Sequence, residues 1–160
     1  YLEQLYTFGE PLRDPRGRVI SVAYVALVRP SLVPLVHAGS DAAEATWFVA
    51  DLVEEQAISG PGLAFDHDVI LSTALARIRG KIGYAPIAFD LVPETFTVGE
   101  LRAVYEAVKG QGFDASNFRK RFSRMLADGI IERAPGYRAT SARRAAVYRF
   151  KRTSYSQELK

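Results

Sequence analysis

Residues 97–129 read TVGELRAVYEAVKGQGFDASNFRKRFSRMLADG, and their pattern predicts two consecutive helices. Thr97 and Glu100 have the spacing of a capping box, in which a hydroxyl and a carboxylate satisfy backbone N–H groups at a helix start. The apolar side chains that follow recur at helical spacing, and they are Leu101, Val104, Tyr105 and Val108. Gly110 and Gly112 are expected to end this first helix.

The second helix is predicted from Asp114 to Leu126. Its apolar stripe consists of Phe118, Phe122, Met125 and Leu126. The opposite face carries Asn117, Lys120, Ser123 and Arg124, while Arg119 and Arg121 flank the stripe. This division indicates an amphipathic helix with one buried face and one basic, solvent-facing side.

A two-stranded hairpin is expected after the second helix. Gly129 ends that helix, and short strands are predicted over residues 130–133 and 146–151, with a loop over residues 135–145. Helix, turn, helix and hairpin form the order of a winged helix-turn-helix domain, which we place at residues 97–152. Residues 153–160 read as a polar tail.

Positive charge is concentrated in this second half of the chain. Residues 116–152 hold eleven Lys and Arg and two acids, a net charge of +9, whereas residues 1–115 hold nine basic and fifteen acidic residues, a net of −6. A basic module of this size is the electrostatic footprint of a nucleic-acid binder. We therefore expect double-stranded DNA as a partner.

The predicted DNA contacts come from the second helix and the hairpin. The helix is expected in the major groove, where Asn117, Lys120 and Arg124 would reach base edges or nearby phosphates. Backbone phosphates are the expected partners of Arg119 and Arg121. In the hairpin, phosphates or a minor groove are expected to be contacted by Arg138, Arg143 and Arg144. The alternatives are a solvated charged face or a protein-interaction module.

Composition excludes several other classes of protein. Hydrophobic residues at 48% and charged residues at 24% are ordinary values for a globular chain of 160 residues. The absence of cysteine rules out disulfides and cysteine-ligated metals, and the chain has only two histidines, His37 and His67. The longest apolar run, Val19–Val28, is too short to cross a bilayer. We expect a cytoplasmic protein without a membrane segment.

Residues 1–85 read as an α+β segment joined to the second module by a connector at residues 86–96. Strands are expected at residues 1–10, 18–28 and 46–52, the second of them covered on both faces, and a helix begins near Phe65. Trp47 is expected in the core. The loop between the first two of these strands contains Arg13, Arg16 and Arg18. Their guanidinium groups suit the phosphates of an effector, and a solvated turn accounts for them equally well. His67 either contacts a ligand or simply caps and packs.

Several runs in the chain resemble one family. They are LEQLYTFG at residues 2–9, RDPRGRVISVAY at 13–24, LAFDH at 63–67 and FTVGEL at 96–101. These runs are similar to the Nudix-related transcriptional regulators, in which a Nudix-like domain is fused to a C-terminal winged helix. The resemblance implies an α+β chain, namely a partial Nudix-like α/β sandwich followed by a winged helix-turn-helix domain.

The resemblance also implies a function. Such proteins are bacterial regulators, usually repressors of NAD or sugar metabolism genes, and their Nudix-like domain senses ADP-ribose or a related nucleotide or sugar phosphate. They form homodimers that read palindromic operators. The effector is a ligand, and no cofactor is expected.

The chain departs from the family in two places. It lacks the Nudix signature, whose paired carboxylates bind the metals that activate water, so hydrolysis by this mechanism is not expected. The run Asp51-Leu52-Val53-Glu54-Glu55 echoes the end of that signature, but Ala50 and Ala57 replace the required Arg and Gly. The family places the signature before Leu2, so a Nudix hydrolase acting on ADP-ribose stays an alternative. The usual Gly-Arg-Pro-Ala of the wing reads Ala142-Arg143-Arg144-Ala145.

Overall fold

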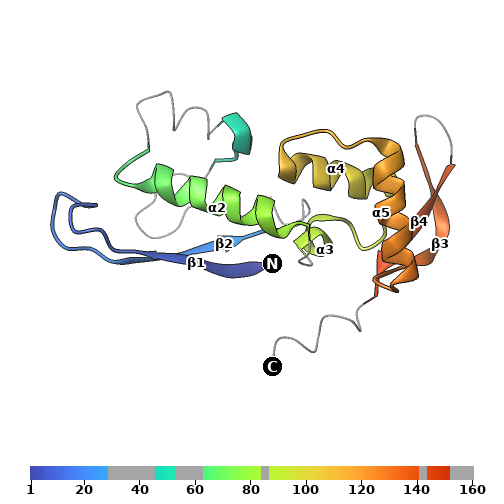
Figure 1. Cartoon of the computed structure of the whole chain (residues 1–160), viewed down its shortest axis with the longest axis horizontal. Helices are drawn as coiled ribbons and strands as arrows, with labels where there is room; N and C mark the ends of the chain where they lie inside the picture. The colour runs from blue at the N-terminus through green and yellow to red at the C-terminus, as the bar shows by residue number, and fades with distance from the viewer. Residues whose placement is uncertain (29–45, 53–62, 84–86, 141–143, 152–160) are drawn as a thin grey trace. The chain divides into compact units, whose positions relative to one another are not determined.

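The fold is described by a computed structural model of the whole chain. It describes residues 1–28, 46–52, 63–83, 87–140 and 144–151. Two compact units make up the chain, unit 1 at Tyr1–Gly83 and unit 2 at Tyr84–Lys160. Both contain helices and antiparallel strands, which confirms the α+β class (Figure 1).

Unit 1 is built on a hairpin covered by a helix. Strands β1 (Leu2–Phe8) and β2 (Ser21–Ala26) pair antiparallel, and helix α2 (His67–Lys81) lies along one face of them (Figure 1). Burial alternates along β2, and Tyr24 remains 61% exposed. The expectation that this strand is covered on both faces was therefore wrong, because β-branched runs alone do not reveal how many faces are packed.

Residues 46–52 do not form the expected strand. Residues 50–52 are helical, and residues 46–49 have no regular structure. Trp47 is 57% exposed, so its predicted place in the core was also wrong. Short apolar runs fit a strand and a helix equally well by periodicity, which explains the error.

Unit 2 contains three helices and the hairpin among its described residues. Helices α3 (Ile87–Leu91), α4 (Val98–Lys109) and α5 (Ala115–Ala127) precede strands β3 (Ile131–Ala139) and β4 (Arg144–Phe150). The segment expected as a connector instead contributes α3 to this unit. Its Ile87, Val92 and Phe96 are fully buried, and Phe89 stacks on Phe150 with ring centroids 3.5 Å apart. The sequence did not indicate this short helix, because Pro86 and Pro93 near its ends are typical of a connector.

The helix boundaries in unit 2 follow their capping residues. The Thr97 hydroxyl accepts the Glu100 N–H at 3.2 Å, and the Glu100 carboxylate accepts the Thr97 N–H at 2.7 Å, so the predicted capping box is confirmed. Gly110 ends α4 with φ 64°, a left-handed conformation that glycine adopts without strain. Asp114 caps α5 by accepting the Asn117 N–H at 2.8 Å.

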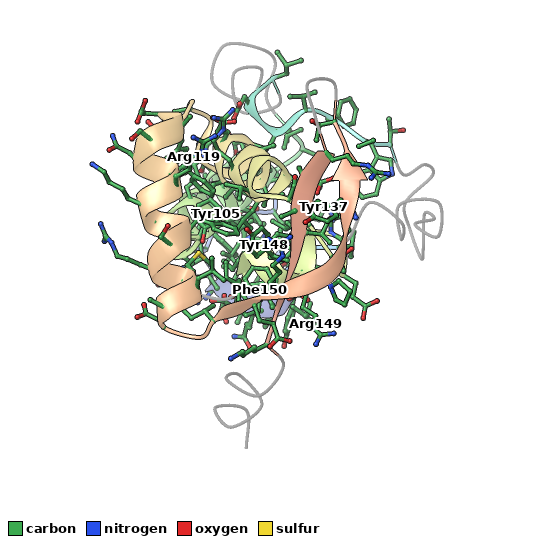
Figure 2. The ribbon with its side chains drawn as sticks, turned by 90° about the vertical axis from the view of Figure 1, so that its right-hand side faces the viewer. Tyr105, Arg119, Tyr137, Tyr148, Arg149 and Phe150 are labelled. Carbon is green, nitrogen blue, oxygen red and sulfur yellow. The ribbon has the colours of Figure 1, made fainter. Side chains whose placement is uncertain are left out.

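The core of unit 2 lies between the helices and the hairpin. Leu101, Phe118 and Ile131 are at most 1% exposed. The rings of Tyr105 and Phe118 meet edge to face, as do those of Phe122 and Tyr148. Figure 2 shows Tyr105 and Tyr148 between α5 and the hairpin. These contacts confirm that the aromatic residues of the predicted stripe form the core.

The hairpin is longer than its sequence indicated. The strands run over Ile131–Ala139 and Arg144–Phe150, so they extend into the predicted loop at residues 135–145, of which residues 137–139, 144 and 145 are paired. Pro135 and Gly136 lie at a register shift between Arg133 and Tyr137. A bulge accommodates a residue without an N–H donor and a glycine with positive φ, so these turn formers interrupt the ladder without ending the strand.

Candidate nucleic-acid interface

The solvent-facing side of α5 carries three of the predicted DNA-contacting residues. Asn117, Lys120 and Arg124 are exposed, whereas Phe118 and Phe122 on the opposite side are buried. The buried stripe fixes the rotation of the helix, and that rotation determines which side chains face outward. The structure therefore places these three together on one free helix face, as expected.

The two flanking arginines differ in their surroundings. Arg119 is exposed, whereas Arg121 is partly buried with its guanidinium 4.5 Å from the centre of the Tyr105 ring. Its Nη2 also lies 3.4 Å from the Tyr105 hydroxyl. A guanidinium stacked on an aromatic ring keeps its charge while its side chain is held in one orientation. Arg121 is thus a positioned cation at the margin of the helix face.

A groove of about 590 Å³ is bordered by the starts of α4 and α5 and by the hairpin. Its walls include the start of α4 at Thr97, the first turns of α5, and the hairpin around Tyr137. Three arginines from three elements line it, namely Arg102, Arg119 and Arg144. Figure 2 shows Arg119 and Tyr137 at the same end of the unit. The cluster is suited to polyanion binding, because helix starts and arginines both favour negative charge.

Arg102 was missed by the sequence reasoning. It belongs to the acidic stretch of residues 1–115, so the charge count concealed it. Its position two residues after Glu100, in the first turns of a predicted helix, was a usable signal, because the capping box already fixed where that helix begins. Its Nε lies 3.4 Å from a carboxylate oxygen of Glu106.

Arg138 is engaged within unit 2. Its Nη1 donates to both carboxylate oxygens of Glu100, at 2.6 and 2.7 Å, and its Nη2 donates to the Thr95 carbonyl at 2.9 Å. Burial raises the pKa of Glu100, but the hydrogen bonds from Arg138 and Thr97 outweigh it and hold this pKa below its ordinary value. The geometry ties the hairpin to the start of α4. Of the other predicted hairpin contacts, Arg144 is exposed and Arg143 lies outside the described residues.

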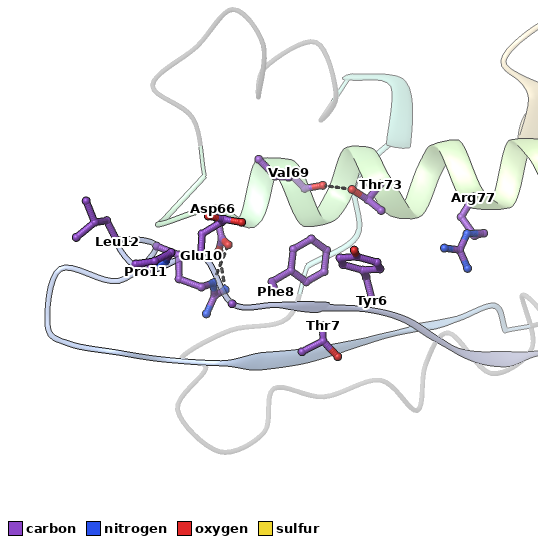
Figure 3. Close-up of a pocket in the computed structure, with 12 residues that line it drawn as sticks. Tyr6, Thr7, Phe8, Glu10, Pro11, Leu12, Asp66, Val69, Thr73 and Arg77 are labelled. Atoms are coloured by element: carbon purple, nitrogen blue, oxygen red, sulfur yellow. Dashed lines mark hydrogen bonds and ion pairs between the residues drawn. The ribbon is translucent and has the colours of Figure 1, made fainter.

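A second cavity lies within unit 1. It has a volume of about 810 Å³ and is lined by the end of β1, the loop after it, and α2 (Figure 3). Figure 3 shows the Tyr6 and Phe8 rings turned toward α2, with Arg77 reaching down from the helix. Its walls combine these rings with Thr73 and Arg77, which is the usual make-up of a small-molecule pocket.

The predicted effector-binding arginines are mostly occupied by internal contacts. Arg13 has a side chain only 6% exposed and forms a two-pronged ion pair with Asp66, at 2.7 and 2.6 Å. Arg16 pairs with Asp14, and its side chain lies over the Phe65 ring. The ion pair with Arg13 occupies both carboxylate oxygens of Asp66, the N-cap residue of α2, which explains why Asp66 makes no side-chain capping bond. Both arginines thus stabilise the loop.

The pocket brings together only one of the four predicted effector residues. Arg13 lines it, whereas Arg16, Arg18 and His67 are not among the described lining residues. Arg18 donates to the Gly9 carbonyl, and His67 is exposed at the start of α2, with its ring edge-on to Phe65. The loop folds its arginines back on itself, which a sequence pattern does not reveal.

Arg77 is the pocket cation that sequence reasoning missed. The Glu3 carboxylate accepts hydrogen bonds from Arg77 at 2.9 Å and from Lys81 at 2.6 Å, so two cations share one carboxylate. That end of the pocket therefore carries surplus positive charge. The signal was available, because Val69, Thr73 and Arg77 recur at i, i+4 and i+8 on one helix face.

No helix in the described part of the chain is long and apolar enough to cross a membrane.

Residues 88–150 match the family model described as the NrtR DNA-binding winged helix domain. A curated relative, the ADPR responsive transcriptional repressor NtrR of Acinetobacter baylyi, is 34% identical over 155 residues. The alignment covers 97% of this chain, which spans only 58% of that relative.

Solved structures give a similar result. Shewanella oneidensis NrtR in complex with a 27mer DNA superposes with a TM-score of 0.68 at 27% identity, over 94% of this chain and 64% of that one. A MutT/nudix family protein from Enterococcus faecalis superposes with a TM-score of 0.62 at 28% identity, over 94% of this chain and 61% of that one. Residues 88–150 therefore match a winged helix domain of the NrtR type, and the chain over nearly its whole length is similar to Nudix-related transcriptional regulators.

Proposed function

We propose that this chain is the DNA-binding and effector-sensing part of a transcriptional repressor. The observation that carries the proposal is the free face of α5, where Asn117, Lys120 and Arg124 stand exposed on a helix whose opposite side is buried. An α-helix with side chains is about 10–12 Å wide, and the major groove of B-DNA is about 12 Å wide. In this proposal α5 enters that groove.

The hairpin side of the interface would hold the DNA backbone. Arg119 and Arg144 face the groove of unit 2 from two elements, and Arg121 is held in place by Tyr105. Contacts of this kind fix the register of a protein on the duplex without reading its sequence. The solved DNA complex of the Shewanella relative supports this arrangement at the level of the fold.

The effector is proposed to be ADP-ribose or a closely related nucleotide, bound in the pocket of unit 1. A cavity of about 810 Å³ lies within the ordinary size range of small-molecule sites, roughly 300–1,000 Å³. The Tyr6 and Phe8 rings suit an adenine base, and the surplus cation at Arg77 suits a phosphate. The ADPR-responsive relative supports this choice of effector. For the ligand to weaken DNA binding, it must bind one arrangement of the protein more tightly than another.

The remaining parts of the proposal follow the family. The protein acts in the cytoplasm as a homodimer on a palindromic operator, controls NAD or sugar metabolism genes, and does not hydrolyse its effector. Unit 1 forms part of its Nudix-like domain, and unit 2, with α3 included, forms the winged helix. Clear turnover of ADP-ribose with magnesium or manganese would favour the hydrolase alternative instead.

The test is binding of the chain to duplex DNA from its own upstream region, measured by fluorescence anisotropy across a salt series. Neutralising phosphates makes affinity fall steeply with salt, by about 0.9 in log–log slope for each phosphate contacted. A scrambled duplex serves as the control, and ADP-ribose is added in a parallel series. Selective binding weakened by ADP-ribose supports the whole proposal. Selective binding that ADP-ribose leaves unchanged removes the effector, and no binding at low salt refutes the regulator in favour of an interaction module.

A further inference from the structure

We propose that Arg138 is a positioning residue that locks the wing against the start of α4, and that it does not contact DNA. The inference rests on the proposed DNA-binding function. It assigns a role to the Glu100–Arg138 pair, which is joined by two hydrogen bonds and lies entirely within unit 2.

The donors of Arg138 are directed at the protein. Nη1 lies within hydrogen-bonding distance of both Glu100 oxygens, and Nη2 lies 2.9 Å from the Thr95 carbonyl and 3.2 Å from the Thr95 hydroxyl. The side chains of Arg138 and Glu100 are 35% and 38% exposed, so the pair is partly screened from solvent. A guanidinium bound at this many points would have to give up most of these bonds to reach a phosphate.

The partner carboxylate has a second structural task. The same Glu100 closes the capping box of α4 by accepting the Thr97 N–H. One carboxylate therefore joins the first turn of α4 to β3, through two residues that lie 38 positions apart in the chain. The two terminal nitrogens of Arg138 are held by different partners, Nη1 by the Glu100 carboxylate and Nη2 by Thr95, so the direction of the guanidinium is restrained as well as its distance.

The Glu100–Arg138 pair lies next to the part of the hairpin that lines the groove of unit 2. Arg138 is cross-strand from Ala145, and the next pair, Ala139 and Arg144, is the last of the ladder before the wing tip. Arg144 lines the groove from the hairpin, and Arg119 lines it from α5. Fixing β3 to α4 at this register fixes how far apart these two cations lie. We infer that the pair sets the spacing of two phosphate contacts.

Glu100→Gln is the decisive variant. Glutamine retains the capping-box acceptor at this position but loses the charge that binds Arg138. The change removes a negative charge from a DNA-binding unit, so electrostatics alone predicts tighter binding. We instead expect affinity to fall about tenfold, roughly the value of one lost charge-assisted hydrogen bond. The slope of affinity against salt should decrease when a displaced Arg144 no longer meets its phosphate.

Two further variants and a control complete the experiment. Arg138→Lys keeps the charge but has a single nitrogen, which cannot hold Glu100 and Thr95 together as Nη1 and Nη2 do, so it should resemble Glu100→Gln. Arg144→Ala should weaken binding in the parent but much less in the Glu100→Gln background, because the contact is already displaced. The control is Glu132→Gln, which removes the acid of the Arg149 ion pair, at 2.7 Å, from the opposite end of the same hairpin. It should bind as well as the parent or slightly better.

The outcomes separate this inference from the proposed function. If the parent chain does not bind DNA selectively, the regulator proposal fails and this inference fails with it. When the parent binds and Glu100→Gln binds equally well, only the positioning role is refuted. When Glu100→Gln binds more tightly, the positioning role is refuted and Arg138, released from Glu100, is a phosphate contact as the sequence first suggested. Circular dichroism of each variant at the assay temperature ensures that folded protein is compared. A lowered Tm with unchanged affinity means a purely structural pair and overturns the inference.

Discussion

Truncating the exposed cations of α5 should weaken DNA binding without disturbing the fold. Lys120 and Arg124 lie one helical turn apart on the solvent-facing side, opposite the buried Phe118 and Phe122. Because neither cation packs in the core, Lys120→Ala and Arg124→Ala should change the free energy of unfolding by less than about 0.5 kcal/mol. Any loss of affinity is then a loss of contact with DNA.

The size of the loss depends on what each side chain meets. A base-directed contact is worth about 1–3 kcal/mol, which corresponds to roughly a 5- to 150-fold loss for the cognate duplex. A phosphate contact would instead weaken all duplexes and reduce the log–log salt slope by about 0.9. Arg124 and Lys120 should differ in this respect if only one of them reaches a base edge.

The assay is fluorescence anisotropy with cognate and scrambled duplexes at several salt concentrations. Arg149→Ala is the matched control, because it removes one cation from the same unit at a distance from the groove. Figure 2 shows Arg149 and Arg119 at opposite ends of unit 2. If Lys120→Ala and Arg124→Ala both bind as tightly as Arg149→Ala, then α5 is not the recognition helix and the reasoning is refuted.

Three further predictions concern the fold. Thr97→Ala should lower stability by about 1 kcal/mol through loss of the capping bond, measured by urea unfolding with circular dichroism, and an unchanged midpoint would contradict it. Phe118→Ala should cost about 3–5 kcal/mol because its ring is 1% exposed, and parent-like stability would exclude its place in the core. Hydrogen bonds from Arg16 lower the pKa of Asp14 from 3.8 to about 2, so its contribution is present above about pH 4 and is lost as the pH falls toward 2. The Tm of the parent should therefore fall more steeply over this range than that of Asp14→Asn, and parallel curves would contradict the ion pair.

Local rules were sufficient for much of unit 2. The capping box at Thr97 and Glu100 and the end of the helix at Gly110 were predicted and are present, because they depend on residues within one turn of each other. The exposed face of α5 could also be read from the sequence, since burying one stripe of a helix fixes what lies opposite. The unexpected α3 illustrates the limit, because five residues give too little periodicity to detect.

The candidate site in unit 1 was predicted less well. Arg13, Arg16 and Arg18 were expected to face an effector, yet Arg13 is paired with Asp66, 53 positions along the chain. Whether a guanidinium meets a ligand or a carboxylate depends on which acid the fold brings close, and sequence spacing carries no such information. Arg77 was not expected to face an effector, yet it lines the pocket. The surplus positive charge there arises because Arg77 and Lys81 share one carboxylate, Glu3, which β1 places beside α2.

The sequence by itself determined the order of elements in the winged helix, the side of α5 that faces solvent, and the excess of positive charge there. These features follow from periodicity, capping and composition, which act over one or two helical turns. Only the tertiary structure decided which of the cations are free. In the folded chain Arg138 forms an ion pair with Glu100 and Arg13 forms one with Asp66, whereas Lys120 and Arg124 stay exposed. The physical reason is that an ion pair forms wherever the folded chain brings opposite charges within about 4 Å, whatever their separation in sequence.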